Sequence, residues 1–292
     1  MSDPASADLA VVIVNFNTGP WLDRCLASLE RHRGGVALDV LVIDNASIDD
    51  SQDAARSHPG VRLIENPTNR YLSPAWNQGA RETKAPFLLF LNPDTEWWSG
   101  TLADLLAVAV GDPQAGIVGP TIRDPDGTLY ASGRRFPSVV EGAGHAFVSP
   151  FTRNNPFTRR YEMEGWDRTT PRTVDWVSGA CMLFPRAAFD EVGGFDEGFP
   201  LYAEELDIAS RLAAAGWHVR YTPAAEVLHQ VGVSTTPGGR RPHRLVVMHA
   251  HSIYRYYRIH RAAGWRRLTL PFARAALRVQ AELAWAWRGV RR

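Results

Sequence analysis

Residues 9–45 read LAVVIVNFNTGPWLDRCLASLERHRGGVALDVLVIDN and set the class of the fold. The first six positions, Leu9–Val14, are apolar and mostly β-branched, the pattern of a strand buried on both faces. Val40–Ile43 returns as a second buried strand. Between them, apolar residues recur at the i, i+3, i+4, i+7 spacing of a helix, at Leu22, Cys25, Leu26 and Leu29. The stretch therefore predicts a β-α-β unit with parallel strands.

The alternation of strand and helix continues beyond this unit. The expected elements are helices at 49–57 and 73–84, strands at 61–64 and 87–91, then a helix after residue 99 and a strand at 115–118. Ser73 and Ser99 are the expected N-caps, and Pro74 suits a first helical turn. Four alternations in about ninety residues indicate an α/β fold, a mostly parallel sheet with helices on both faces. Such sheets bind ligands at the carboxyl ends of their strands.

Polar side chains follow three of the expected strands at those carboxyl ends. They are Asn15, Asn17, Asp44, Asn45, Asn92 and Asp94. Asn and Asp are also common turn residues, so any one of them alone indicates little. Three strand ends together favour a ligand site. The sequence has no GxGxxG after the first strand and no GxxxxGK[ST], which counts against dinucleotide oxidoreductases and P-loop NTPases.

A second informative stretch runs from Trp176 to Gly216. It begins with an expected strand to Pro185 and ends with an expected amphipathic helix over 203–215. Glu205 projects within about 30° of the centre of that helix's apolar stripe, while Asp207 points well away and Glu204 sits at the margin. The helix macrodipole explains Glu204 and Asp207. An inward carboxylate after a glycine-rich loop needs another reason, and a general base is the interpretation we favour.

Composition sets the remaining limits. Of the 292 residues, 45% are hydrophobic and 22% charged, and the net charge of +1 argues against general nucleic-acid binding. Cys25 and Cys181 each lie in an apolar pattern and are expected to be reduced core residues. The first ten residues lack the pattern of a signal peptide, and no apolar run reaches the length of a membrane span. We therefore expect a cytoplasmic or peripheral protein.

Further elements are expected between the two informative stretches and after them. They are a hairpin over 123–137, a long loop over 141–173, a strand over 221–228, and a boundary at 237–239 before a helical tail.

The end of the chain differs from the rest in composition. From Arg240 the chain has thirteen arginines and one acid, Glu282. Arginines alternate there with Tyr254, Tyr256, Tyr257, Trp265, Trp285 and Trp287, a composition suited to an interfacial helix on an anionic membrane. The alternative is a solvated basic helix packed on the rest of the protein.

Several segments occur in the order found in a known family. They are VVIVNFNT, VLVIDNASIDD, residues 69–79, FLLFLNPDTE, WVSGACMLF, FDEVGGFDE, YAEELD and the later His229. The chain resembles family 2 glycosyltransferases with the GT-A fold. IRDPDG, WVSGAC and GGFDE resemble the bacterial rhamnosyltransferases of that family, particularly the actinobacterial type that adds rhamnose to polyprenyl-diphosphate-linked N-acetylglucosamine. The resemblance implies a catalytic domain at 1–235, with a nucleotide-binding half (1–96) and an acceptor half (97–235), and an extension at 236–292.

The resemblance also implies roles for individual residues. For donor binding these are Asn15, Phe16 and Asn17 beside the base, Asp44 on the base or ribose, and Asn77, Asn92 and Asp94. Asp94 ends the metal motif and His229 can complete the shell of a divalent cation, Mg²⁺ or Mn²⁺. Glu205 matches the catalytic base. Glu204, Trp176, Ser178 and Gly179 are the acceptor-site candidates, although Trp176 is equally suited to the core and Ser178-Gly179 to close backbone approach.

Three positions depart from the family pattern. Asn92 replaces the first aspartate of the metal motif, Glu205 replaces an aspartate at the base position, and Arg70-Tyr71-Leu72 stands where a glycine and an aromatic residue are usual. A metal site with one aspartate remains chemically reasonable, because a nucleotide diphosphate and water can supply further oxygen ligands.

The favoured function is inverting transfer of a sugar, with dTDP-L-rhamnose as the expected donor and a glycan or lipid-linked sugar as the acceptor. The nearest alternative keeps the reaction and uses a UDP-hexose. A sugar-phosphate nucleotidyltransferase would need a basic, glycine-rich loop after the first strand, and NFNTGP contains no basic residue. A non-catalytic carbohydrate-binding protein would not need the three acids Asp44, Asp94 and Glu205.

Overall fold

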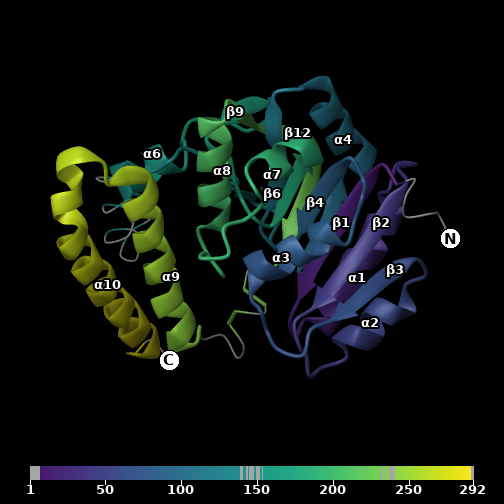
Figure 1. Cartoon of the computed structure of the whole chain (residues 1–292), viewed down its shortest axis with the longest axis horizontal. Coiled ribbons are helices and arrows are strands. Elements are labelled where there is room, and N and C mark those ends of the chain that lie inside the picture. The colour runs from purple at the N-terminus through teal and green to yellow at the C-terminus, as the bar shows by residue number, and fades with distance from the viewer. Residues whose placement is uncertain are drawn as a thin grey trace.

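The protein has three layers, with a twisted sheet between two layers of helices (Figure 1). The computed structural model describes residues 7–138, 141–142, 144, 148, 152, 154–230, 232–233, 235–236 and 241–290. The first part of the chain alternates as expected. Its elements are β1 (Leu9–Asn15), α1 (Gly19–Arg31), β2 (Leu38–Asp44), α2 (Ser51–Ser57), β3 (Val61–Glu65), α3 (Leu72–Arg81) and β4 (Phe87–Leu91). The predicted α/β class is therefore confirmed.

Alternate residues of strand β1 contribute to two hydrophobic cores, one on each face of the sheet. Leu9, Val11 and Ile13 point to one face, where they pack with α1, α2 and α4. The alternate residues Ala10, Val12 and Val14 point to the other face, where α3, α7 and α8 cover the sheet. A continuous apolar run is required because both faces of the strand are buried. Each face thus has its own hydrophobic core.

The second part of the chain completes the sheet with mixed directions. Its strands are β5 (Thr95–Ser99), β6 (Ala115–Arg123), β7 (Leu129–Tyr130), β8 (Gly133–Arg134), β9 (Arg172–Val174), β10 (Trp176–Val177), β11 (Cys181–Pro185) and β12 (His218–His229). Within the described residues, ten strands form the main sheet: eight follow the path β3-β2-β1-β4-β11-β6-β12-β5, while β7 pairs with β6 and β9 pairs with β12. Strands β3, β2, β1 and β4 are parallel, and β11 lies antiparallel between β4 and β6.

Helices accompany these strands before the end of the chain. They are α4 (Leu102–Gly111), α6 (Pro156–Tyr161), α7 (Arg186–Glu191) and α8 (Glu204–Ala214). The expected hairpin forms between β6 and β7, with Gly127 at a positive φ of 82° in its turn. Cys25 and Cys181 are buried and unpaired, as expected.

Four local predictions were wrong. Helix α3 begins two residues earlier than expected, with Tyr71 at its N-cap instead of Ser73, and Ser73 Oγ donates to the Phe199 carbonyl at 2.6 Å. Ser99 ends strand β5, and Thr101 caps α4 through a reciprocal pair of bonds with Asp104. The strand expected from Trp176 to Pro185 is broken between β10 and β11. The expected loop at 141–173 contains α6, and the expected boundary at 237–239 lies outside the described residues.

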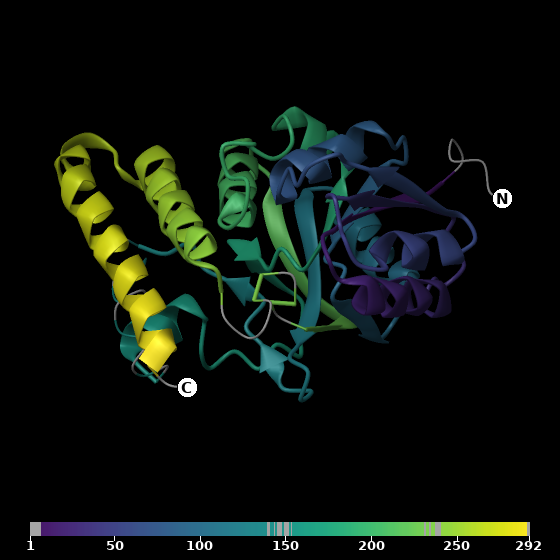
Figure 2. The same cartoon turned by 90° about the horizontal axis from the view of Figure 1, so that it is seen from below.

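The tail forms a helical hairpin beside α8, clear in both views (Figures 1 and 2). It consists of α9 (His243–Tyr256), a π-helical turn (Tyr257–Arg261), a 3₁₀ turn (Gly264–Thr269) and α10 (Leu270–Val290). We call residues 243–290 the C-terminal hairpin. None of the helices in the described part of the chain has the length and apolar character to cross a membrane.

Candidate active site

Asn15 and Asp44 lie side by side at the carboxyl ends of β1 and β2, where they are register partners. Asn15 Nδ2 donates to Asp44 Oδ1 at 2.9 Å, and both residues are almost completely buried. The Asp44 carboxylate accepts three more bonds, from Ser47 N at 3.0 Å, Ser47 Oγ at 2.5 Å and Gln52 Nε2 at 3.1 Å. Asn15 and Asp44 therefore lie together at this edge of the sheet, as predicted. The Asp44 carboxylate also holds the adjoining loop through its bonds to Ser47.

Phe16 and Asn17 continue this edge just beyond β1, and both are half-buried. Asn17 has a positive φ of 54°, and its Oδ1 accepts a bond from Ile48 N at 2.8 Å. Its own N–H donates to Ser47 Oγ at 2.9 Å. The Asn17 side chain therefore links the loop after β1 to the loop after β2. Ile48 is 93% exposed, so this pair of loops forms an open rim.

Asn92, Asp94 and His229 form a second cluster, at the end of β4 and the end of β12. His229 Nε2 lies 3.2 Å from Asp94 Oδ1 and 3.4 Å from Asn92 Nδ2. His229 is placed there because β12 pairs with β5 at Thr95, which immediately follows Asp94. Sequence positions 92–94 and 229 are thus brought together as the resemblance implied.

This cluster fits a divalent cation that has further ligands from elsewhere. Neighbouring donor atoms on an octahedral ion with bonds of about 2.1 Å are about 3.0 Å apart, close to the measured Asp94–His229 separation. In the described residues, no group of three or more His, Cys, Asp or Glu side chains could hold a metal by itself. The chain therefore offers one carboxylate and one imidazole, and the remaining positions suit diphosphate oxygens and water.

The break between β10 and β11 connects this cluster to the candidate base. Ala180 O accepts a bond from Asn92 N at 2.9 Å. A Cβ placed on Gly179 would lie 3.9 Å from both Glu204 Oε1 and Glu205 Cβ. The turn at 178–180 therefore bonds to the metal-motif segment on one side and lies beside the first turn of α8 on the other. Ser178 and Gly179 thus lie between Asn92 and the two acids of α8.

Glu204 and Glu205 occupy the first turn of α8 and are both withdrawn from water. Glu204 is 6% exposed, whereas Glu205 is half-buried as a residue but has a fully buried Oε2 atom. Neither Oε2 atom has a hydrogen-bond partner among the described residues. Burial raises the pKa of both carboxyl groups, that of Glu204 well above its ordinary value because Glu205 adds a second negative charge. Two such groups without protein partners are suited to proton transfer.

Arg134 distinguishes the two carboxyl groups. Burial raises the pKa of Glu205, and the positive charge of Arg134 opposes that rise; Glu204 has no comparable cation acting on it within the described structure. The guanidinium stacks among Tyr130, Tyr161 and Trp176, with ring centroids 5.0, 5.3 and 5.1 Å from Cζ. Glu205 is therefore the member of the pair that ionises more readily.

Sequence reasoning missed Arg134 and left open whether Trp176 belongs to the core or to the acceptor site. Trp176 is 4% exposed, its indole N–H donates to the Arg135 carbonyl at 3.0 Å, and Arg134 covers its ring. This burial favours the core. The available signal for Arg134 was its position two residues before Phe136 and four after Tyr130 in a glycine-containing turn. That signal does not identify the pairing of β8 with β10, which aligns Arg134 with Trp176.

Asn77 also has a different setting from the expected one. Its Nδ2 donates to the Phe195 carbonyl at 2.9 Å and to Glu197 Oε1 at 3.2 Å, and its Oδ1 accepts from Phe195 N at 3.0 Å. The carboxamide is thus committed to the loop at 193–200. Asn77 fastens that loop to α3 and does not face the donor rim.

The comparisons with known proteins agree with this geometry. Residues 10–193 match the glycosyl transferase family 2 model, and residues 132–287 match glycosyl transferase family group 2. The chain belongs to glycosyl transferase family 2. It is 38% identical over 288 residues to N-acetylglucosaminyl-diphospho-decaprenol L-rhamnosyltransferase of Mycobacterium tuberculosis, which covers 94% of this chain and 92% of the relative. Pre-mycofactocin glycosyltransferase of the same organism is 30% identical over 239 residues, or 78% of this chain and 44% of that protein.

Solved structures support the fold of this family 2 member. A mannosyltransferase from Pyrobaculum calidifontis in complex with GDP-Man and Mn²⁺ has a TM-score of 0.57 at 19% identity, covering 97% of this chain and 76% of that one. GalNAc-T7 with UDP, GalNAc and Mn²⁺ has a TM-score of 0.63 at 17% identity, covering 92% and 51%. The GT-A fold expected from the resemblance is confirmed.

Proposed function

We propose that this family 2 glycosyltransferase transfers L-rhamnose from dTDP-L-rhamnose to a hydroxyl of polyprenyl-diphosphate-linked N-acetylglucosamine, with inversion, in cell-envelope polysaccharide synthesis. The substrate assignment rests on the 38% identity over 94% of the chain to a rhamnosyltransferase whose name states this acceptor class. The structural observation that carries the reaction type is the turn at 178–180, which bonds to Asn92 and lies beside the Glu204–Glu205 pair.

Glu205 is the proposed general base. Its carboxylate accepts the proton of the acceptor hydroxyl as that oxygen bonds to the anomeric carbon, and the bond from the same carbon to the diphosphate oxygen breaks with its electron pair. A single displacement inverts the anomeric centre and requires no carboxylate nucleophile. Arg134 favours the ionised form of Glu205, and Glu204 retains the proton that two adjacent buried acids can share.

Asp94 and His229 are the proposed protein ligands of a Mg²⁺ or Mn²⁺ ion. Their 3.2 Å separation and positions at the strand ends support this assignment. The bound ion would neutralise charge on the leaving diphosphate. Asn92 lies beside both residues, and its neutral amide leaves Asp94 as the negative charge of the motif. Asn15, Phe16, Asn17 and Asp44 remain the proposed donor rim, in which Asp44 fixes the loop that receives the nucleotide.

A donor panel tests the proposal. Purified protein is incubated with dTDP-L-rhamnose, UDP-hexoses and GDP-mannose, each with Mn²⁺ or Mg²⁺ and a polyprenyl-diphosphate N-acetylglucosamine acceptor. Nucleoside diphosphate release and the product's mass are measured. We expect dTDP-L-rhamnose to give the highest kcat/KM. Preference for a UDP- or GDP-sugar would replace the donor assignment, and binding without turnover of any donor would favour a carbohydrate-binding protein.

The C-terminal hairpin is the proposed contact with the cytoplasmic face of the membrane. Trp265, Leu268, Phe272, Val279 and Leu283 are between 56% and 77% exposed. Phe272, Val279 and Leu283 fall within about 40° on one side of α10, which makes a single apolar stripe. Arg266 and Arg267, in the 3₁₀ turn that precedes α10, suit anionic headgroups. Arg274 and Arg278 leave α10 about 120–160° away from the stripe and line the groove toward α9.

The hairpin also has a groove that suits a phosphate-bearing headgroup. A groove of about 490 Å³ between α9 and α10 is lined by Tyr254, Leu270, Arg274 and Arg278, among others. Tyr256, one of the aromatics expected at the membrane, is 3% exposed and points toward α8. The side chains of Trp287 and Arg288 lie outside the described residues.

Liposome flotation tests the membrane contact. The intact protein is mixed at low salt with vesicles of phosphatidylcholine alone or with about 30% phosphatidylglycerol, and Phe272→Ser/Leu283→Ser is compared with wild type. We expect flotation with anionic vesicles, loss of flotation in the double variant, and weakening at high salt. Absence of wild-type flotation with anionic vesicles would rule out the contact.

A further inference from the structure

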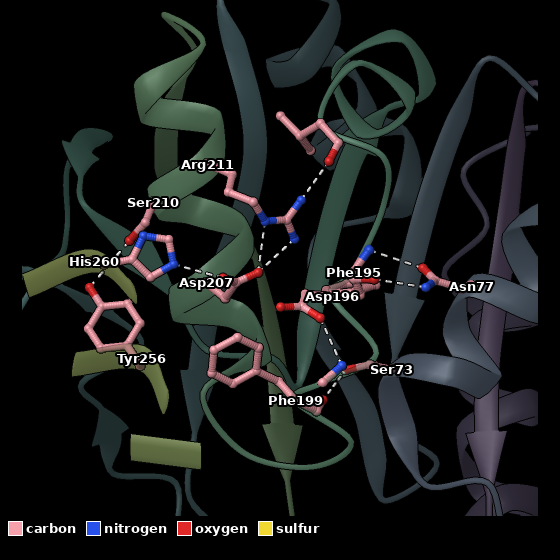
Figure 3. Close-up of polar contacts among 12 residues, drawn as sticks. Ser73, Asn77, Phe195, Asp196, Phe199, Asp207, Ser210, Arg211, Tyr256 and His260 are labelled. Atoms are coloured by element: carbon pink, nitrogen blue, oxygen red, sulfur yellow. Dashed lines mark hydrogen bonds and ion pairs between the residues drawn. The ribbon is translucent and has the colours of Figure 1, made fainter. Parts of the chain in front are cut away.

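We propose that the C-terminal hairpin positions the catalytic helix α8, with His260 and Asp207 as the positioning pair. Asp207 is 1% exposed, and the imidazole of His260 and the guanidinium of Arg211 reach it from different elements (Figure 3). His260 Nε2 of the π-helical turn lies 2.7 Å from Asp207 Oδ1, and Arg211 Nη2 lies 2.7 Å from Oδ2. Arg211 also donates to the Val192 carbonyl at 2.6 Å. Asp207, which was expected to point away from the apolar stripe, is thus buried and bonded to the hairpin.

Asp207 is placed to affect the base without touching it. It follows Glu205 by two positions, so the two side chains leave α8 on different sides, about 200° apart. Glu205 faces the turn at 178–180, and Asp207 faces the hairpin. Rotation or sliding of α8 that breaks the Asp207 contacts must therefore also move Glu205. A displacement of about 1 Å at a reacting group can cost on the order of 10² in rate.

Further contacts fasten the hairpin to the approach to α8. Ser210 Oγ and Tyr256 OH are 3.2 Å apart, and Ser252 Oγ donates to the Leu201 carbonyl at 2.9 Å. Arg255 Nη2 donates to Asp196 Oδ2 at 2.6 Å, and its guanidinium lies 5.0 Å from the centre of the Phe199 ring. The attachment therefore covers both α8 and the loop that leads into it.

The same loop is fixed on its other side by the nucleotide-binding half. Asn77 binds the Phe195 backbone (Figure 3). The N–H groups of Leu72 and Ser73 donate to the Pro200 carbonyl at 2.8 and 3.3 Å. Tyr202 and Ala203 then enter α8 with φ of 69° and 63°, a conformation that costs energy for residues with a Cβ. The surrounding contacts must stabilise the backbone conformation of Tyr202 and Ala203, and on one side these contacts come from the hairpin.

The inference rests on the proposed role of Glu205, and kinetics provide the first test. His260→Ala and Asp207→Asn in the full chain are expected to lower kcat by about 10- to 100-fold while the donor KM stays within about threefold. His260→Gln keeps an N–H group that can reach Asp207 and should recover most of kcat. The matched control is Asp39→Asn, since Asp39 is 5% exposed and pairs with Arg62 at 2.8 Å at the amino end of β2. The control should lose stability and keep kcat.

Hydrogen–deuterium exchange provides a readout that does not depend on turnover. The amides of residues 201–209 should exchange faster in His260→Ala than in wild type, and at the wild-type rate in Asp39→Asn. Normal kcat in His260→Ala overturns the proposal even if exchange rises, because the contact would then be structural alone. If wild type transfers no sugar from any donor, the proposed function fails, and the exchange comparison alone decides whether the hairpin holds α8.

Discussion

The carboxylates at the proposed donor rim and at the start of α8 differ in their hydrogen bonding. At the rim, the Asp44 carboxylate accepts four hydrogen bonds from three residues and organises the adjoining loop. At the start of α8, Glu204 is almost completely buried and Glu205 is half-buried, yet the buried Oε2 atom of each has no hydrogen-bond partner in the described structure. Unsatisfied buried polar groups reduce stability. The difference favours a structural role for Asp44, which orders the adjoining loop, and a proton-transfer role for the two acids of α8.

Glu205→Gln gives the largest expected effect on this comparison. The amide keeps the shape of the side chain and removes the base, so transfer should fall by about 10²–10⁴ while donor binding remains near normal. Steady-state kinetics with calorimetric donor titration measure both quantities. Glu204→Gln is the matched control and should retain most activity. An inactive Glu204→Gln beside an active Glu205→Gln would move the base to the other member of the pair.

Asp94→Asn tests whether the strand-end region contributes chemistry as well as shape. Charge neutralisation by a metal is worth several kcal/mol, so loss of its carboxylate ligand should reduce turnover by roughly 10²-fold or more. Increasing Mn²⁺ should restore part of the rate in the variant if affinity is what was lost. Full wild-type turnover in excess chelator would contradict a metal role for Asp94 and His229.

Arg134→Met should change the pH dependence of the reaction. The positive charge opposes the rise in the pKa of Glu205, so its removal raises that pKa further and fewer bases are ionised at a given acid pH. The acid limb of the kcat profile should move to higher pH, and the rate at a fixed acid pH should fall roughly tenfold if the limb moves by about one pH unit. Arg172→Met, which removes a guanidinium stacked 5.3 Å from the Trp166 ring centre, is the control and should leave the limb in place.

The smallest effect is on stability, where two substitutions should act in opposite directions. Burial raises the pKa of Glu204, so the folded state holds this proton more tightly than the unfolded state and loses stability as the pH rises above the carboxyl's ordinary value. Glu204→Gln should therefore raise Tm at neutral pH and leave it unchanged in acid. Asp44→Ala should lower Tm, because it leaves the partners of that carboxylate unsatisfied. Each kcal/mol corresponds to roughly 2–4 °C. A lower Tm for Glu204→Gln at neutral pH would contradict the proposed difference between Glu204, which lacks partners, and Asp44, which has them.

The first ninety residues were predictable because their signals are local. The apolar run of β1, the spacing of α1 and the polar residues after each strand all follow from periodicity within short windows. The strand ends meet at one edge because parallel strands order themselves that way, which brought Asn15 and Asp44 together as predicted. The family resemblance added His229, which lies far from Asp94 in sequence and adjacent to it in the fold.

The unpredicted parts depend on contacts between distant segments. Helical phase predicted Glu205 toward the interior, Glu204 at the margin and Asp207 well away. In the structure Glu204 and Asp207 are 6% and 1% exposed and Glu205 is half-buried; Asp207 is covered because the C-terminal hairpin packs on its side of the helix. Asn77 looked like a rim residue because nothing local shows that its amide meets Phe195, 118 positions later. Arg134 was missed for the same reason: its neighbours come from β10 and α6.

The attachment of the hairpin to α8 has a consequence for the order in which the enzyme matures. Ribosomes deliver residues 243–261 within the last fifth of the chain, after the nucleotide rim and the base helix have already emerged. Domains generally fold as units, so contacts that reach α8 from residues synthesised after it can form only once those residues are present. The nascent protein would therefore align its base only when Arg255 and His260 arrive, so that sugar transfer awaits synthesis of the hairpin.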